Sequence, residues 1–177
     1  MTNDPLSAAP VGGRSSHSSS GFASFDTAMG RCAVEWSERG LTKVWLPEAP
    51  RHRPHDDPPA AVADAVDLLS ALLAGDDVEL TDVQLDLDGI PDFDRRVYAA
   101  ARALPRGITA TYGELARRVG VPGAAQAVGQ AMGHNRFPLV VPCHRVVAAG
   151  GGNGGFSAPG GVDTKLRLLA LESVTLF

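Results

Sequence analysis

One stretch of this sequence combines residue types that could carry out nucleophilic chemistry: Pro142-Cys143-His144-Arg145. A cysteine attacks as its thiolate, and the positive charge of neighbouring His144 and Arg145 would lower the thiol's pKa. On an extended chain adjacent side chains point apart, so we expect His144 to reach the Cys143 thiol through a bridging water, with a carboxylate holding the imidazole. The alternative is that Cys143 simply packs in the core, as free cysteines commonly do.

Cys32 is the other cysteine of the chain. Two cysteines without a CxxC spacing, and an N-terminus without an apolar secretion signal, favour a reduced, cytoplasmic chain with free thiols. A disulfide between Cys32 and Cys143 remains an alternative. We expect no metal, no cofactor and no membrane partner, because no apolar run approaches the ~20 residues of a membrane span.

Charge is distributed unevenly along the 177 residues. Residues 1–92 carry 6 Lys and Arg against 16 Asp and Glu, a balance of −10, and residues 93–177 carry 10 against 4, a balance of +6. This asymmetry indicates an acidic lobe joined to a basic lobe that meets a polyanion. A merely solvated basic face is the alternative reading.

The N-terminal half is expected to form a small sheet with one helix. Residues 1–20 are rich in Ser, Pro and Gly and predict a disordered tail. Residues 21–90 form the first lobe, in which Cys32, Val34 and Trp36 alternate with small or polar residues as in a half-buried strand. The expected elements are strands at 21–26, 31–37, 41–46 and 83–87, and a helix at 60–74 stopped by Gly75.

The C-terminal lobe, residues 91–177, is expected to be mostly helical. Asp92 would cap a helix that runs to about Leu104, and Thr111-x-x-Glu114 is a capping box that opens another helix. A glycine-containing turn at 120–123 separates it from a helix at 124–132, as in a helix-turn-helix. A generic helical hairpin would look similar, and the basic balance favours the DNA-binding reading.

A last helix at 163–172 follows a glycine-rich loop at 150–155, which should be mobile or approach something closely. The fold class is therefore α+β: a small N-terminal sheet-plus-helix lobe, then a mostly helical C-terminal lobe with a winged-helix-like helix-turn-helix.

The cysteine stretch resembles the signature of a known family. Pro142–Val147 (PCHRVV) is similar to the core motif of the O6-alkylguanine-DNA alkyltransferases. The resemblance extends through the C-terminal lobe at Thr109–Ala116 (TATYGELA), Ala124–Met132 (AAQAVGQAM), Asn135 and Leu166–Glu172 (LRLLALE). The N-terminal lobe resembles the family only loosely, through its small sheet and its position.

The resemblance implies direct DNA repair by one irreversible alkyl transfer from O6 of guanine. Family members bind duplex DNA through the minor groove and rotate the damaged nucleotide into a pocket. Cys143 would be the nucleophile and acceptor, His144 its base through a water, and Glu172 the carboxylate that orients His144. Tyr112 would crowd the phosphate and help protonate the leaving base. Asn135 would brace the active-site loop, and Arg145 would be a structural part of the motif.

Further residues follow from the same match. The DNA-binding residues it implies are Thr111, Ala124, Ala125, Gln126, Ala127, Gly129 and Arg145. Those of the substrate pocket are Tyr112, Val146, Phe156, Ser157 and Lys165. For Tyr112 a packed core aromatic, for Glu172 a solvated carboxylate and for Lys165 a surface charge remain the alternatives. The implied partner is double-stranded DNA containing O6-alkylguanine, bound by a monomer, with cooperative binding left open.

Two positions depart from the family pattern. Gln126 stands where an arginine usually fills the gap left by the flipped base, and glutamine lacks the charge and the planar stacking surface of a guanidinium. Phe156 stands where a tyrosine is common, so that wall of the pocket has no hydroxyl.

Other functions remain as alternatives. A non-enzymatic, alkyltransferase-like lesion binder would lack the acceptor cysteine, so Cys143 speaks against it. A Cys-His hydrolase would not need a basic lobe, and a plain helix-turn-helix regulator would not explain the PCHR motif.

Overall fold

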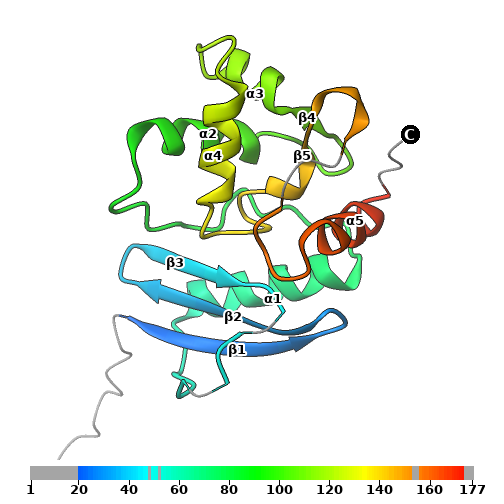
Figure 1. The fold of residues 1–177 in the computed structure, drawn as a ribbon. Helices are drawn as coiled ribbons and strands as arrows, with labels where there is room; N and C mark the ends of the chain where they lie inside the picture. The colour runs from blue at the N-terminus through cyan, green and yellow to red at the C-terminus, as the bar shows by residue number, and fades with distance from the viewer. Residues whose placement is uncertain (1–19, 48, 52, 153–155, 174–177) are drawn as a thin grey trace, which may run out of the picture.

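The computed structural model describes residues 20–47, 49–51, 53–152 and 156–173 (Figure 1). The predicted tail, apart from Ser20, and residues 153–155 of the predicted glycine-rich loop lie outside the described residues. In the described part, a sheet formed by the N-terminal lobe lies against a layer of helices formed by the C-terminal lobe (Figure 1).

The N-terminal sheet is an antiparallel meander of β1 (Gly21–Thr27), β2 (Gly30–Ser37) and β3 (Gly40–Trp45), which confirms the first three predicted strands. Its period-2 pattern decides which side chains are buried together. Cys32, Val34 and Trp36 lie in the main core, whereas Ala33 packs with Phe22 in a smaller cluster.

α1 (Ala60–Ala74) supplies the helix of this lobe and ends where predicted, because Gly75 adopts the left-handed conformation that glycine favours. Its buried residues, Val62, Ala65, Leu69, Leu72 and Leu73, join the main core. That core continues into the C-terminal lobe as far as Leu168.

The predicted strand at 83–87 is wrong. Leu85 forms only an isolated parallel bridge with Leu41, where Leu41 N–H donates to Gln84 O at 2.9 Å and Asp86 N–H donates to Leu41 O at 2.8 Å. Gly40 permits this approach, since a Cβ there would lie 2.6 Å from Gln84 O. Val83 is buried, but so is Asp86, so burial in this segment does not alternate as it does along a strand.

Three helices form the upper part of the C-terminal lobe in Figure 1: α2 (Asp92–Arg102), α3 (Tyr112–Arg118) and α4 (Ala125–Gly133). The capping box is confirmed, with Thr111 Oγ1 accepting from Glu114 N and Glu114 Oε2 accepting from Thr111 N. The prediction for Asp92 is wrong, because Pro91 occupies the capping position and Asp92 is in the first turn. α2 also ends two residues before the predicted Leu104.

Short elements that the sequence pattern did not reveal hold the cysteine motif. β4 (Ala110–Thr111) pairs in parallel with β5 (Val146–Val147), and a 3₁₀ turn, η1 (Cys143–Arg145), precedes β5. A second 3₁₀ turn, η2 (Ala149–Gly151), follows. α5 (Gly161–Leu171) begins two residues before the predicted last helix. Among the described residues, no helix has the length and apolar character needed to cross a membrane.

Candidate active site

Cys143 begins the 3₁₀ turn η1 and is 8% exposed, so the extended backbone assumed for this motif is wrong. Both cysteines are free thiols, which excludes the alternative of a disulfide between them. Asn135 braces the segment that leads to Cys143: its Nδ2 donates to Val141 O at 2.9 Å and its Oδ1 accepts from Phe137 N at 2.9 Å. The bracing predicted for Asn135 is therefore visible as two hydrogen bonds.

Burial raises the pKa of the Cys143 thiol above its ordinary value. The Asn135 side chain, the charge of Lys165 and the backbone N–H groups of Cys143 and His144 act in the opposite direction and stabilise the thiolate. The net direction is upward, so the thiol stays protonated in the resting protein. A nearby base is needed to remove its proton.

His144 is completely buried and forms a 2.8 Å hydrogen bond between its Nε2 and Glu172 Oε1. Burial lowers the pKa of His144, although Glu172 opposes that shift, so the imidazole is neutral at physiological pH. A neutral imidazole that donates through Nε2 keeps a lone pair on Nδ1. Nδ1 is buried and has no hydrogen-bond partner among the residues that the structure describes. It is therefore available as a base.

Glu172 is buried, so the alternative of a solvated carboxylate is wrong. Burial alone would raise the pKa of Glu172, but hydrogen bonds from His144 and Arg145 outweigh it and lower the pKa to about 2. Arg145 donates through Nε to Oε2 at 2.9 Å and through Nη2 to Oε1 at 2.8 Å. The carboxylate is consequently ionised and fixed from two sides.

Arg145 was predicted both to contact DNA and to be a structural part of the motif, and its position contradicts the first prediction and supports the second. The residue is 4% exposed, and its remaining guanidinium nitrogen donates to Leu104 O at 2.7 Å. With its donors directed at Glu172 and Leu104, Arg145 has a structural role in the site and presents no surface to a phosphate.

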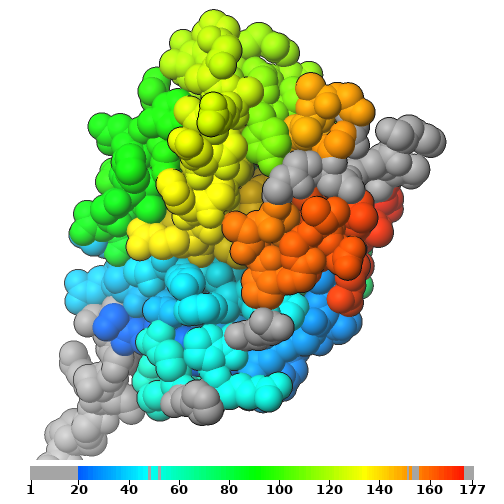
Figure 2. Space-filling view, in the orientation of Figure 1, coloured from blue at the N-terminus to red at the C-terminus, as the bar shows by residue number. Residues whose placement is uncertain are grey.

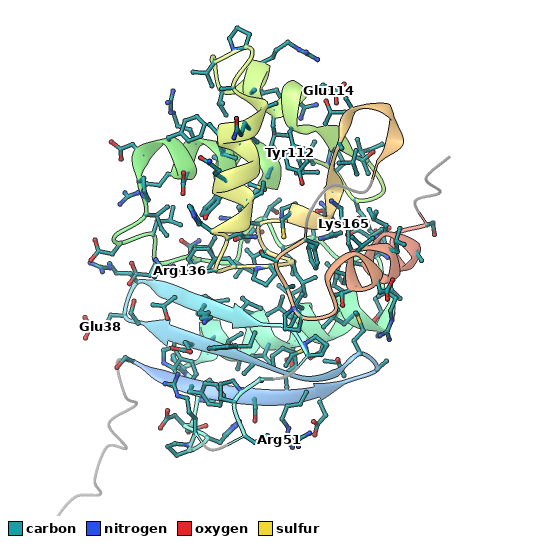
Figure 3. The ribbon with its side chains drawn as sticks, viewed as in Figure 1. Glu38, Arg51, Tyr112, Glu114, Arg136 and Lys165 are labelled. Atoms are coloured by element: carbon teal, nitrogen blue, oxygen red, sulfur yellow. The ribbon has the colours of Figure 1, made fainter. Side chains whose placement is uncertain are left out.

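Lys165 is completely buried, so the surface-charge alternative is also wrong. Its Nζ donates to Val146 O at 2.5 Å, and burial lowers its pKa while Cys143 acts to raise it. In Figure 3, Lys165 lies on the inner side of α5, toward the centre of the molecule. Neither Val146 nor Lys165 lines the pocket described next, so these two residues, which were predicted as pocket walls, are buried outside its lining.

A pocket of about 610 Å³ opens above Cys143. Its walls come from the start of α3, one face of α4 and the segment before α5, and Figure 2 shows these surfaces side by side, with α4 in yellow and the latter segment in orange. The predicted residues that line it are Tyr112, Ala125, Gln126, Gly129, Phe156 and Ser157. Burial raises the pKa of Tyr112, so its hydroxyl stays protonated at neutral pH.

Sequence reasoning missed three wall residues, Gln130, Met132 and Gly133. Helical spacing could have found all three, because Gln130 and Gly133 lie four and seven residues after Gln126, and Met132 lies three residues after Gly129. Ala124, Ala127 and Thr111 were predicted to bind DNA, and none of them lines the pocket. Thr111 is the N-cap residue of α3. α4 is held by α2, since the Tyr98 hydroxyl donates to Ala131 O at 3.2 Å.

Known proteins resemble the chain over most of its length. A family model described as "6-O-methylguanine DNA methyltransferase, DNA binding domain" matches residues 92–174. A methylated-DNA–protein-cysteine methyltransferase of Mycolicibacterium paratuberculosis is 50% identical over 125 residues, which are 67% of this chain and 73% of that protein. The protein of the same name from Mycobacterium tuberculosis strain H37Rv is 43% identical over 146 residues, 82% of this chain and 84% of the relative.

A solved structure shares the fold. The crystal structure of Mycobacterium tuberculosis OGT in complex with DNA superposes with a TM-score of 0.73 at 40% sequence identity. The match covers 85% of this chain and 91% of that chain.

Proposed function

Because this chain belongs to the family of methylated-DNA–protein-cysteine methyltransferases, we propose that it repairs DNA by moving an alkyl group from O6 of guanine to Cys143, once per molecule. The observation that carries this proposal is the free Nδ1 of a neutral, Glu172-bound His144, the residue that directly follows the buried Cys143 at an open pocket. A thiol in that setting has an imidazole that can accept its proton, and the pocket has space for a bound nucleobase.

The proposed activation is a relay from Cys143 through a water to His144. The Cys143 proton moves by way of the water to His144 Nδ1, and the imidazolium that forms is stabilised by the ionised Glu172. Asn135 and Lys165, which both favour the thiolate electrostatically, support the same step.

The proposed transfer is a single displacement. The thiolate electron pair forms a bond to the alkyl carbon while the bond from that carbon to O6 breaks, and guanine leaves with the electron pair of that bond. The leaving base takes up a proton, for which the protonated Tyr112 hydroxyl is the proposed donor. The thioether product has no leaving group that water can displace, so the protein is consumed.

The proposed DNA surface is the pocket face of α4, where Gln126 is exposed at the rim. We place the reaction on duplex DNA in the cytoplasm, with the nucleotide flipped into the 610 Å³ pocket. Phe156 supplies an apolar wall to that pocket without a hydroxyl.

Mass spectrometry after incubation with DNA containing O6-methylguanine tests the function. We expect the peptide that contains Cys143 to gain the mass of one methylene, as a methyl group replaces the thiol proton, while the Cys32 peptide stays unmodified. An unmodified Cys143 peptide together with tight DNA binding would instead identify a lesion-binding protein. Turnover beyond one product per molecule would identify a hydrolase.

Gln126 provides a prediction on base flipping. Gln126→Ala should slow transfer on duplex DNA about tenfold, because the orphaned partner base loses its hydrogen bond and flipping costs a few kcal/mol. Gln126→Arg should bind more tightly at low salt and show a steeper salt dependence, because it adds one phosphate-attracting charge. Single-turnover rates and DNA affinities measure both. Identical values for the two variants and the original chain would remove Gln126 from the mechanism.

A further inference from the structure

Arg106 belongs to the turn between α2 and β4, yet its side chain is only 13% exposed. Its guanidinium reaches two separate helices. Nη2 donates to Gly75 O at 3.1 Å and to Leu171 O at 2.7 Å, and Nη1 donates to Asp76 O. Asp77, which is 93% exposed, lies 3.7 Å from Nε.

The two helices that Arg106 reaches both present their C-terminal ends. The last carbonyl groups of a helix lack intrahelical partners and carry partial negative charge, which a cation satisfies. Neither α1 nor α5 has a basic residue in its own last turn. Arg106 supplies that charge to both ends at once and so joins the N-terminal lobe to α5.

Glu172 is the residue directly after α5, next to the Leu171 carbonyl that Arg106 holds. The same turn also approaches its carboxylate, since Gly107 N–H donates to Glu172 Oε2 at 3.5 Å. Gly75 itself lies against Leu171, because an added Cβ would meet Leu171 Cδ2 at 3.7 Å. The position of Glu172 therefore depends on how the end of α5 sits against α1.

We propose that Arg106 is a positioning residue: by clamping the ends of α1 and α5 together it keeps the Glu172 carboxylate on His144. This inference rests on the proposed function, in which Glu172 supports the base. A short path connects Arg106 to the proposed base. Arg106 holds the Leu171 carbonyl, Glu172 is the next residue, and its carboxylate bonds His144. Three charged groups act on the residues of this path. Arg145 forms an ion pair with Glu172, Asp77 faces Arg106, and the charge of Lys165 acts on His144 and Cys143.

Arg106→Met tests this, since methionine keeps much of the side chain's bulk without its donors. We expect transfer from methylated DNA to slow about tenfold at about pH 7, because a displaced Glu172 weakens general-base catalysis. DNA affinity should stay unchanged. The deficit should shrink as the pH rises, because hydroxide then competes with the relay in deprotonating the thiol. Arg106→Lys, which still places a cation at both helix ends, should recover most of the rate.

Arg102→Met is the matched control. Arg102 also joins the lobes through carbonyl groups, donating from Nη2 to Leu80, Thr81 and Val83 at 2.7–3.2 Å, but it does not contact α5 or Glu172. The Arg102→Met variant should have a lower melting temperature than the original chain and a transfer rate within twofold of it. An Arg106→Met rate equal to that of the original chain, a deficit that does not change with pH, or an equal deficit in Arg102→Met would overturn the proposal.

Reaction of the same variants with iodoacetamide, followed on the Cys143 peptide, separates this inference from the proposed function. If the original chain transfers no methyl group, the proposed function fails. In that case a slower, pH-dependent iodoacetamide reaction in Arg106→Met would still support the positioning role, and an unchanged reaction would overturn it as well.

Discussion

Replacing Cys143 by serine is expected to abolish alkyl transfer, lowering the single-turnover rate at least ~10³-fold. A hydroxyl in the place of the thiol is far less acidic and far less nucleophilic, and the neutral His144 is too weak a base to ionise it. The lining of the pocket hardly changes, because sulfur and oxygen occupy the same position. Duplex binding should therefore persist, and the variant should behave as a lesion binder.

Quantitative mass spectrometry of the Cys143→Ser peptide, beside a DNA-binding titration, measures both parts of this prediction. Cys32→Ala is the matched control, because Cys32 is also a buried free thiol but lies in β2, outside the pocket. It should transfer normally. Methylation that continues in Cys143→Ser, or that stops in Cys32→Ala, would contradict the assignment of the acceptor.

Glu172→Gln should have the second largest effect, on stability and on rate together. The amide keeps the shape but removes the charge that faces Arg145 and His144, both of which are buried. An unpaired buried guanidinium costs about 3–5 kcal/mol, which for a chain of this size lowers the melting temperature on the order of 10 °C. Loss of the group that stabilises the imidazolium should slow transfer about 10²-fold.

The pH dependence of this effect follows from the lowered pKa of Glu172, about 2 against an ordinary value of 4.5. The ionised carboxylate stabilises the folded state above about pH 4.5, and this contribution is lost as the pH falls toward 2. A shift of that size corresponds to about 3 kcal/mol. The difference in unfolding free energy between the original chain and Glu172→Gln should therefore be largest at neutral pH and shrink below about pH 4.5.

Asp163→Asn on the same helix is the control for both measurements. Asp163 is an exposed carboxylate in the first turn of α5, where loss of its charge costs at most about 1 kcal/mol. Denaturant unfolding across this pH range distinguishes the two carboxylates. Equal stability of the two variants at neutral pH would show that the buried network contributes no more than a surface charge.

The local patterns of the sequence determined much of the fold. Alternation around Val34 specified β2, the apolar face ending at Gly75 specified α1, and the Thr111–Glu114 pair specified the start of α3. Each of these signals acts within a few residues, because strand alternation, helix termination and capping are properties of the local chain. The pattern at 83–87 failed because pairing depends on the tertiary structure, and this segment meets β3 only at the bridge between Leu41 and Leu85.

Residue types and motif resemblance also singled out Cys143, His144 and Glu172, which we propose as the nucleophile, its base and its carboxylate. The tertiary structure decided their electrostatic states, because these depend on burial and on groups distant in sequence. Glu172 is ionised and fixed because His144 and Arg145 meet it from 28 and 27 positions away. Arg145 and Lys165 are buried in the site. The packing of α5 decides between the DNA contact and the structural role expected for Arg145, and between the pocket and surface positions expected for Lys165.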